Sequence, residues 1–166
     1  MDELDAALVA ELQADARLTN RDLAERVGVA PSTALERVRS LRARGVLRGY
    51  HADVDLPALG RSVQALIAVR IRPPARRRIE EFRDFATALP ETVAVFVVSG
   101  GEDFLIHVAV ADTDALYAFV IDRLTERPEV ADVRTSIVYQ HLRRPALEPL
   151  PARSVGATQP PASRHR

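Results

Sequence analysis

The sequence predicts an α+β protein in which a helical N-terminal part precedes a ferredoxin-like βαββαβ part. Residues 2–44 show the apolar periodicity of three short helices. From residue 64 onward, short strands rich in valine and isoleucine alternate with two longer helical patterns. This second part also contains a weak internal repeat, because a Pro-Glu pair stands between helix and strand in both of its strand–helix–strand units, at Pro90 and at Pro128.

Composition excludes several classes of protein. The chain has 166 residues, of which 47% are hydrophobic and 28% charged, as in an ordinary globular protein. It has no cysteine, which excludes disulfides and thiolate chemistry. It also lacks an apolar run long enough to span a bilayer, and its acidic, helical N-terminus is unlike a signal or transit peptide. We therefore expect a cytoplasmic protein that has no membrane partner.

The first two predicted helices have clear boundary signals. Residues 2–14 carry leucines at helical spacing, and Asp2 is a candidate N-cap. Thr19 or Asn20 is placed to cap a second helix that runs to about Arg26. The two helices are short and amphipathic, so they need a third element to complete a core.

The third predicted helix follows a turn at Gly28. It starts near Pro31, a residue favoured at the first helical position, and runs to Arg44, where Gly45 fits a left-handed cap. Four apolar side chains project to one side at about 100° per residue, and we expect all of them to pack on the first two helices: Ala34, Leu35, Val38 and Leu41.

The opposite face of this helix is polar and edged with guanidinium groups. Although the net charge of the chain is zero, residues 31–48 contain five arginines and one glutamate. Arginine reads guanine or clamps phosphate, and small hydroxyls permit close approach to bases, so the pattern predicts a helix-turn-helix that binds double-stranded DNA rather than a merely solvated helix. We expect bases to be met by Ser32, Thr33, Glu36, Arg37 and Ser40 and phosphates by Arg39, Arg44 and Arg48, with Asn20 and Arg21 completing the DNA-binding set.

The chain divides into four predicted regions. Residues 1–50 form the DNA-binding domain, 51–62 a linker strand and hinge, and 63–150 the ferredoxin-like domain. The alternation in residues 46–55 predicts a strand at the junction. Residues 151–166 are rich in Pro, Ala and Ser, which predicts a disordered tail.

The strands of the ferredoxin-like part are apolar on both faces. Phe104 and Ile106 point one way, while Leu105 and Ala109 point the other. Two helices cover only one face of such a sheet, so the second face requires a cover. An identical sheet is the simplest cover, which predicts a symmetric dimer. We expect strands at residues 64–71, 93–99, 104–110 and 130–140, with helices at 76–89 and from Asp112 onward.

Three stretches of the sequence resemble the leucine-responsive regulatory protein / asparagine synthase regulator (Lrp/AsnC) family of prokaryotic transcription factors. They are residues 4–55, the segment VVSGGEDFLIHVAV at 97–110 and the segment VRTSIVYQHLRRPALEPL at 133–150. The resemblance covers roughly residues 2–150. It implies a winged helix-turn-helix followed by an effector domain of ferredoxin-like fold, with dimers that form through the effector domains and assemble further, to octamers.

The resemblance also implies an amino-acid effector bound between effector domains, near a Gly-x-x-Asp turn. Where the family commonly has an acidic residue and an aromatic in this turn, the chain has Gly101 and Glu102. This departure implies either a ligand unlike the usual apolar amino acids or a vestigial site, and a simple tight turn is the plainest alternative. Carried over residue by residue, the effector would lie near Ser99, Gly100, Gly101, Asp103, Thr135 and Ser136.

No pattern of catalytic residues emerges. The four histidines are too far apart for a metal motif, and no glycine-rich phosphate loop or serine–histidine pattern is present. We therefore expect no enzyme activity, no metal and no cofactor other than an effector. The leading hypothesis is a DNA-binding transcriptional regulator tuned by an amino acid. The alternatives are an amino-acid-binding or assembly module whose helical head docks a protein, and an enzyme for which no residues are found.

Overall fold

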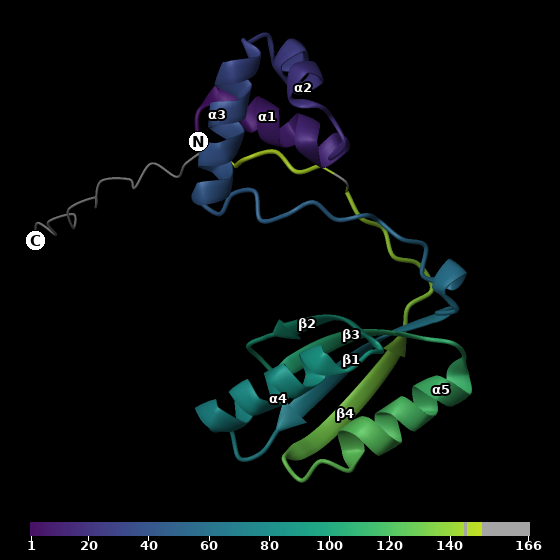
Figure 1. Ribbon diagram of the computed structural model, residues 1–166. Helices are drawn as coiled ribbons and strands as arrows, with labels where there is room; N and C mark the ends of the chain where they lie inside the picture. The colour runs from purple at the N-terminus through teal and green to yellow at the C-terminus, as the bar shows by residue number, and fades with distance from the viewer. Residues whose placement is uncertain (145, 151–166) are drawn as a thin grey trace, which may run out of the picture. The chain divides into compact units, whose positions relative to one another are not determined.

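The computed structural model describes residues 1–144 and 146–150. It contains two compact units, shown in Figure 1. The head consists of Met1–His51 together with the described residues from Arg143 onward, and the body consists of Ala52–Leu142. The predicted tail at 151–166 lies outside the described residues. Within the described part, no helix is both long enough and apolar enough to cross a membrane.

Three helices form the head: α1 (Glu3–Ala14), α2 (Asn20–Val27) and α3 (Pro31–Ala43). The predicted boundaries are confirmed to within about one residue. The side chains of Asp2 and Thr19 each accept a hydrogen bond from the backbone N–H three residues on, at 2.8 and 3.2 Å. These N-caps satisfy backbone donors that would otherwise lack partners, so the short helices begin at defined residues.

The head has a small apolar core. Gly28 ends α2 at a φ of 71°, a left-handed conformation that a side chain would strain, and this turn brings α3 back across α2. The prediction that Leu35 packs inward is wrong, because Leu35 is 39% exposed. It lies about 100° around the helix from the fully buried Ala34 and is not among the apolar residues packed against the head core. The buried residues are Leu8, Leu12, Leu23, Ala24, Ala34 and Leu41.

The strand predicted over residues 46–55 is not formed. The chain after α3 continues as turns and irregular segments as far as a short 3₁₀ helix, η1 (Pro57–Leu59). A strand requires a neighbour with which to exchange backbone hydrogen bonds, and the described residues offer none in this region. Among the described residues, the helix-turn-helix therefore has no wing.

The C-terminal segment returns to α1. The side-chain amide of Gln13 donates to the carbonyl of Leu147 and accepts from its N–H, both at 3.0 Å. Beside this pair, Glu148 and Leu150 lie against the N-terminal half of α1. The described residues from Arg143 to Leu150 thus belong to the head, whereas the prediction ended the ferredoxin-like domain at residue 150.

The body is a four-stranded antiparallel sheet with helices on one face (Figure 1). The strand order β2-β3-β1-β4 is that of the predicted ferredoxin-like βαββαβ fold, which is confirmed. The elements in chain order are β1 (Val63–Ile71), α4 (Arg76–Ala88), β2 (Thr92–Val97), β3 (Phe104–Val110), α5 (Thr113–Ala118) continuing as a π-helix η2 (Phe119–Thr125), and β4 (Val130–Ile137).

The core of the body lies between the sheet and its helices. Alternate residues of the central strands β1 and β3, such as Ile67, Val69 and Ile106, are fully buried there. Their neighbours, such as Leu66, point to the opposite face, where Leu66 is 39% exposed and lines a groove. The fold thus leaves one apolar sheet face open, as the two-faced strands predict.

Candidate functional site

The outward face of α3 presents exposed polar side chains. Ser32, Glu36, Arg39 and Ser40 are all exposed, while Thr33 is half-buried. The first turn of α3 contains no acidic side chain, and Glu36 supplies the carboxylate on this face. The face therefore offers hydroxyl, carboxylate and guanidinium groups that can reach a polar partner such as the edges of base pairs.

Arg37 and Arg44 lie on a different side of α3, where they pair with acids of α1. Arg37 donates to Asp2 at 2.6 Å and lies 3.4 Å from Asp5, and Arg44 donates to Asp5 at 2.6 Å. Asp5 is 2% exposed, so the two guanidinium groups compensate a buried carboxylate. The backbone N–H of Asp5 and the Arg37 guanidinium lower the pKa of Asp2, and Asp2 raises the pKa of Arg37. Within the single chain, these two arginines, which were expected at the DNA, hold α3 to α1.

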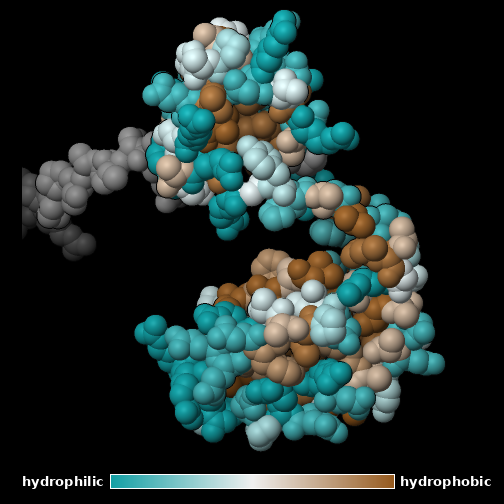
Figure 2. Space-filling model, viewed as in Figure 1, coloured by the Kyte–Doolittle hydropathy of each residue, from teal (hydrophilic) through white to brown (hydrophobic). Residues whose placement is uncertain are grey.

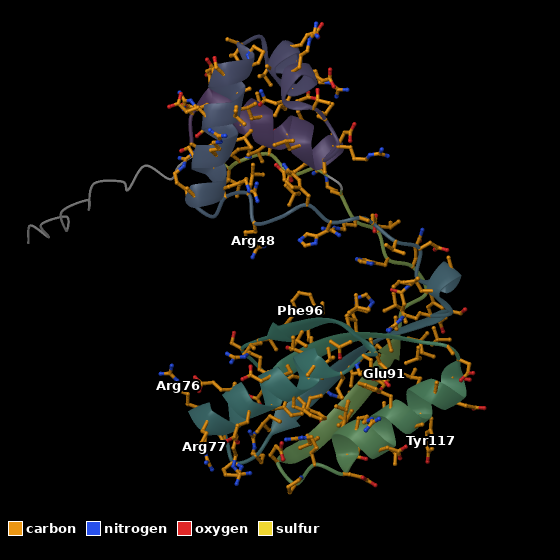
Figure 3. All side chains as sticks on the ribbon, viewed as in Figure 1. Arg48, Arg76, Arg77, Glu91, Phe96 and Tyr117 are labelled. Carbon is orange, nitrogen blue, oxygen red and sulfur yellow. The ribbon has the colours of Figure 1, made fainter. Side chains whose placement is uncertain are left out.

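Asn20 also has a structural partner. Its side-chain amide donates to the carbonyl of Pro31 at 2.7 Å and ties the start of α2 to the start of α3. By contrast, Arg21, Arg39 and Arg48 are exposed and form no ion pair among the described residues. Figure 3 shows Arg48 projecting from the segment that follows α3. Among the described residues predicted to bind DNA, these three arginines are the unpaired cations that the head offers to a partner.

The turn between β2 and β3 is fastened from both sides. Gly100 has a φ of 133°, which favours glycine. The guanidinium of Arg70 donates to the carbonyl of Gly101. One carboxylate oxygen of Asp103 accepts from the N–H of Ile71 at 2.7 Å. The carboxylate of Asp103 therefore has a structural partner in β1, while Ser99, Gly100 and Gly101 are exposed.

Thr135 and Ser136 are not brought to this turn within one chain. They pair with Ile67 and Leu66 in the sheet, four or five residues along β1 from Ile71. At roughly 3.3 Å per residue, this separation is on the order of 15 Å. Neighbouring strand residues also point to opposite faces of a sheet, so the predicted effector set does not form a single pocket in the chain alone.

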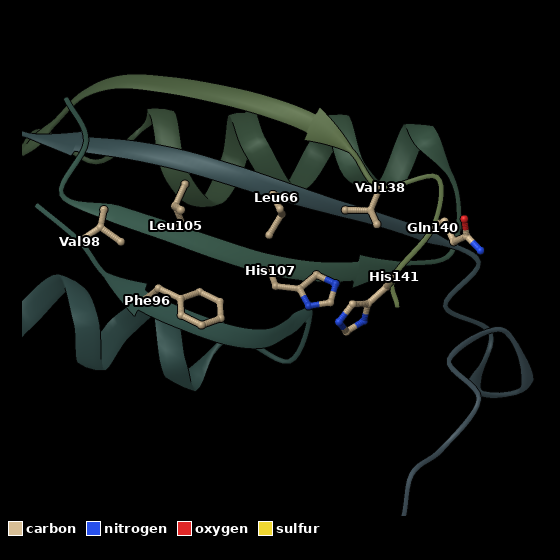
Figure 4. A pocket seen from close by; sticks show the side chains of 8 residues that line it. All are labelled: Leu66, Phe96, Val98, Leu105, His107, Val138, Gln140 and His141. Atoms are coloured by element: carbon tan, nitrogen blue, oxygen red, sulfur yellow. The ribbon is translucent and has the colours of Figure 1, made fainter. Parts of the chain in front are cut away.

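The open face of the sheet carries an apolar groove of about 430 Å³, seen in Figure 4. Figure 2 shows apolar surface gathered on this β2 side of the body. At one end of the groove, a ring nitrogen of His107 lies 3.0 Å from the side-chain oxygen of Gln64. The rings of His107 and His141 meet edge to face, with their centroids 5.6 Å apart. Burial lowers the pKa of His107, and the neighbouring His141 lowers it further. The lining residues are Leu66, Phe96, Val98, Leu105, His107, Val138, Gln140 and His141.

Both units match a known family. The AsnC-type helix-turn-helix domain matches residues 1–42, and the Lrp/AsnC ligand binding domain matches residues 64–146. The chain belongs to the Lrp/AsnC family of transcriptional regulators. The predicted family, the α+β fold class and the regulatory function are therefore confirmed.

Relatives of this family align over most of the chain. HTH-type transcriptional regulator AldR of Mycolicibacterium smegmatis is 41% identical over 143 residues, which cover 86% of this chain and 84% of AldR. The leucine-responsive regulatory protein of Escherichia coli K12 is 31% identical over 87% of this chain and 88% of its own. The L-Met complex of transcriptional regulator NMB0573 from Neisseria meningitidis aligns with a TM-score of 0.81, at 32% identity over 91% of this chain and 96% of that one.

Several residues at these surfaces escaped sequence reasoning. Arg70 donates to the carbonyl of Gly101, and Arg134 forms an ion pair with Glu102. The two arginines lie on different strands, and the pairing of β1 with β4 brings both to the turn. A single arginine in the apolar strand QALIAVRI was the available signal for Arg70. The acids of α1 that hold Arg37 could have been suspected from the uncompensated acidic N-terminus.

Proposed function

We propose that this Lrp/AsnC regulator binds double-stranded DNA sequence-specifically through α3. The observation that carries the proposal is the exposed polar face of α3, where Arg39 forms no ion pair among the described residues. Ser32, Glu36 and Ser40 contact base edges together with Arg39, while Arg21 and Arg48 contact phosphates. Arg37 and Arg44 act indirectly, because their pairs with α1 fix the orientation of α3. The protein acts in the cytoplasm and has no catalytic role.

The active form is a dimer joined through the open sheet face. The apolar groove around Leu66 and Leu105 supports this assembly, because an exposed apolar surface of this kind marks an interaction site. Two heads presented in one assembly can read two half-sites of an operator. Further assembly of dimers, to octamers, remains part of the proposal.

The effector is an amino acid, and no other cofactor is required. The glycine amides of the β2–β3 turn can receive its carboxylate, and the free oxygen of Asp103 can accept from its ammonium group. Thr135 and Ser136 lie far from this turn in the single chain. We therefore propose that they contact an effector held at the corresponding turn of another chain. The L-Met complex of the Neisseria relative supports an amino acid as the class of ligand.

DNA binding is tested by titrating the chain against its own upstream DNA at several salt concentrations. The logarithm of the binding constant should fall steeply with the logarithm of salt, because bound phosphates release counterions. Arg39→Ala should lose roughly 1–3 kcal/mol of sequence discrimination if Arg39 contacts a base. Arg123→Ala, which removes one exposed charge from the body, serves as the matched control. A flat salt response in the wild type would refute the proposal.

The effector is tested by thermal melting of the protein with each of the twenty amino acids. A ligand at 100 times its Kd should stabilise the folded protein by roughly 2.7 kcal/mol. Asp103→Asn retains an oxygen for the N–H of Ile71 but weakens acceptance from an ammonium group, so it should reduce the shift without unfolding the body. If no amino acid raises the melting temperature selectively, the proposed effector class is wrong.

A further inference from the structure

Leu35 is an exposed apolar side chain on an otherwise polar row of α3. It lies three residues after Ser32 and four before Arg39, so the three side chains are neighbours along one helix surface. Leu35 is 39% exposed and does not join the head core, whereas the preceding Ala34 is fully buried. Its exposed methyl groups therefore lie beside the hydroxyl and guanidinium groups that the proposed function places at the DNA.

A single exposed leucine on a protein surface is ordinary and needs no function. The position of Leu35 distinguishes it, because both of its neighbours on this row are exposed and polar. Arg39 forms no ion pair among the described residues, so it can approach the negatively charged DNA and bring Leu35 with it. An apolar group at such a surface gains by meeting another apolar group as water is excluded.

The major groove offers one such group. Among the base edges exposed there, only thymine carries an apolar substituent, its C5-methyl, and apolar side chains contact it in direct readout. We propose that Leu35 contacts the C5-methyl of one thymine in each half-site and so determines specificity at that base pair. This inference rests on the proposed DNA binding through α3. It assigns to Leu35 a preference for thymine that comes from an apolar contact and not from a hydrogen bond.

The test removes the methyl group from the DNA and the leucine from the protein, separately and together. The probe is a duplex selected by the wild-type protein from a random pool, in which each thymine is replaced in turn by deoxyuridine, which lacks only the C5-methyl. The wild type should lose roughly four- to fifteenfold in affinity at one thymine per half-site, which corresponds to burying one or two apolar carbon groups. Leu35→Ala should bind the original duplex more weakly and should no longer respond to deoxyuridine at that position.

Two matched variants make the outcome specific to Leu35. Leu35→Met replaces the branched leucine with an unbranched apolar side chain of similar volume and should retain the response to deoxyuridine. Val46→Ala removes methyl groups from another exposed apolar residue of the head, outside α3, and should leave the full profile unchanged. Because Leu35 and Val46 are both exposed, the melting temperatures of these variants should remain close to that of the wild type.

The outcomes separate this inference from the proposed function. If the wild type and Leu35→Ala respond alike to every deoxyuridine substitution, or if no position affects the wild type, Leu35 does not read a thymine, although DNA binding through α3 stands. If the wild type selects no duplex and shows no dependence on salt, the proposed DNA binding itself fails.

Discussion

The head and the body differ in the polarity of the surfaces that they expose. The head closes a core of six buried residues and directs hydroxyl and guanidinium groups outward, with Arg37 and Arg44 already paired to its own acids. The body closes a core of thirteen buried residues, yet leaves an apolar groove on its sheet. The surface of the head suits a polar partner and that of the body an apolar one, as we propose for a regulator that pairs through one domain and reads DNA through the other.

The largest expected effect comes from placing a charge on the open sheet face. Leu66→Asp should convert the dimer to a monomer, because an unpaired carboxylate buried in the interface costs roughly 3–5 kcal/mol. Leu66 is 39% exposed in the single chain, so the body itself should still fold. Sedimentation would measure the mass. Tyr117→Asp, at a 71% exposed position on α5, is the control and should remain dimeric. A dimeric Leu66→Asp protein would show that pairing uses another surface.

Core truncations compare the stability of the two units. Leu41 in the head and Leu124 in the body are both fully buried, and replacing either with alanine should lower the free energy of unfolding of its unit by about 2–5 kcal/mol. Since the head has the smaller core, Leu41→Ala should unfold the head while the body remains folded. Hydrogen exchange followed by mass spectrometry would resolve the units. Equal loss of protection in both units would show that they unfold together.

A smaller effect is expected from His107 as the pH falls. Burial and then His141 lower the pKa of His107 in the folded state, so the unfolded chain takes up a proton first. The stability present above the unfolded pKa of about 6.5 should decline as pH falls through that value toward the folded pKa. Urea unfolding between pH 7.5 and 5.5 should show a shallower decline for His107→Gln. Identical pH profiles would remove His107 from the account.

The smallest effect concerns the C-terminal segment. Gln13→Ala deletes both hydrogen bonds to Leu147, which are exposed and worth about 1 kcal/mol or less each. The amide of Leu147 should exchange faster with solvent, while α3 keeps its protection. Gln140→Ala, at an exposed residue of the body, should leave the exchange of Leu147 unchanged. Unaltered exchange in Gln13→Ala would show that this contact does not hold the segment.

Local patterns predicted the elements well. N-cap side chains, the turn glycines and the alternation of the strands identify three helices and a βαββαβ order because each signal acts within a few residues. The same reasoning failed at residues 46–55, where the structure has no strand. An alternating pattern forms a strand only where a neighbouring strand completes its hydrogen bonds.

Long-range partners could not be predicted from the sequence. Arg37 was expected at the bases, and its pairing with Asp2 depends on how α1 crosses α3. Leu35 was expected in the core, and its exposure depends on how far α1 and α2 extend around α3. The contact of Gln13 with Leu147 spans 134 residues and has no signal in periodicity or charge.

The central claim, that the body joins two chains so that their heads read DNA together, is tested most directly by the mass of the protein–DNA complex. A selected duplex with two half-sites, mixed with the protein just above its Kd, should yield a complex of two chains per duplex. Leu66→Asp should bind the same duplex far more weakly and one chain at a time. A wild-type complex of one chain per duplex, with equal affinity for a single half-site, would contradict the claim.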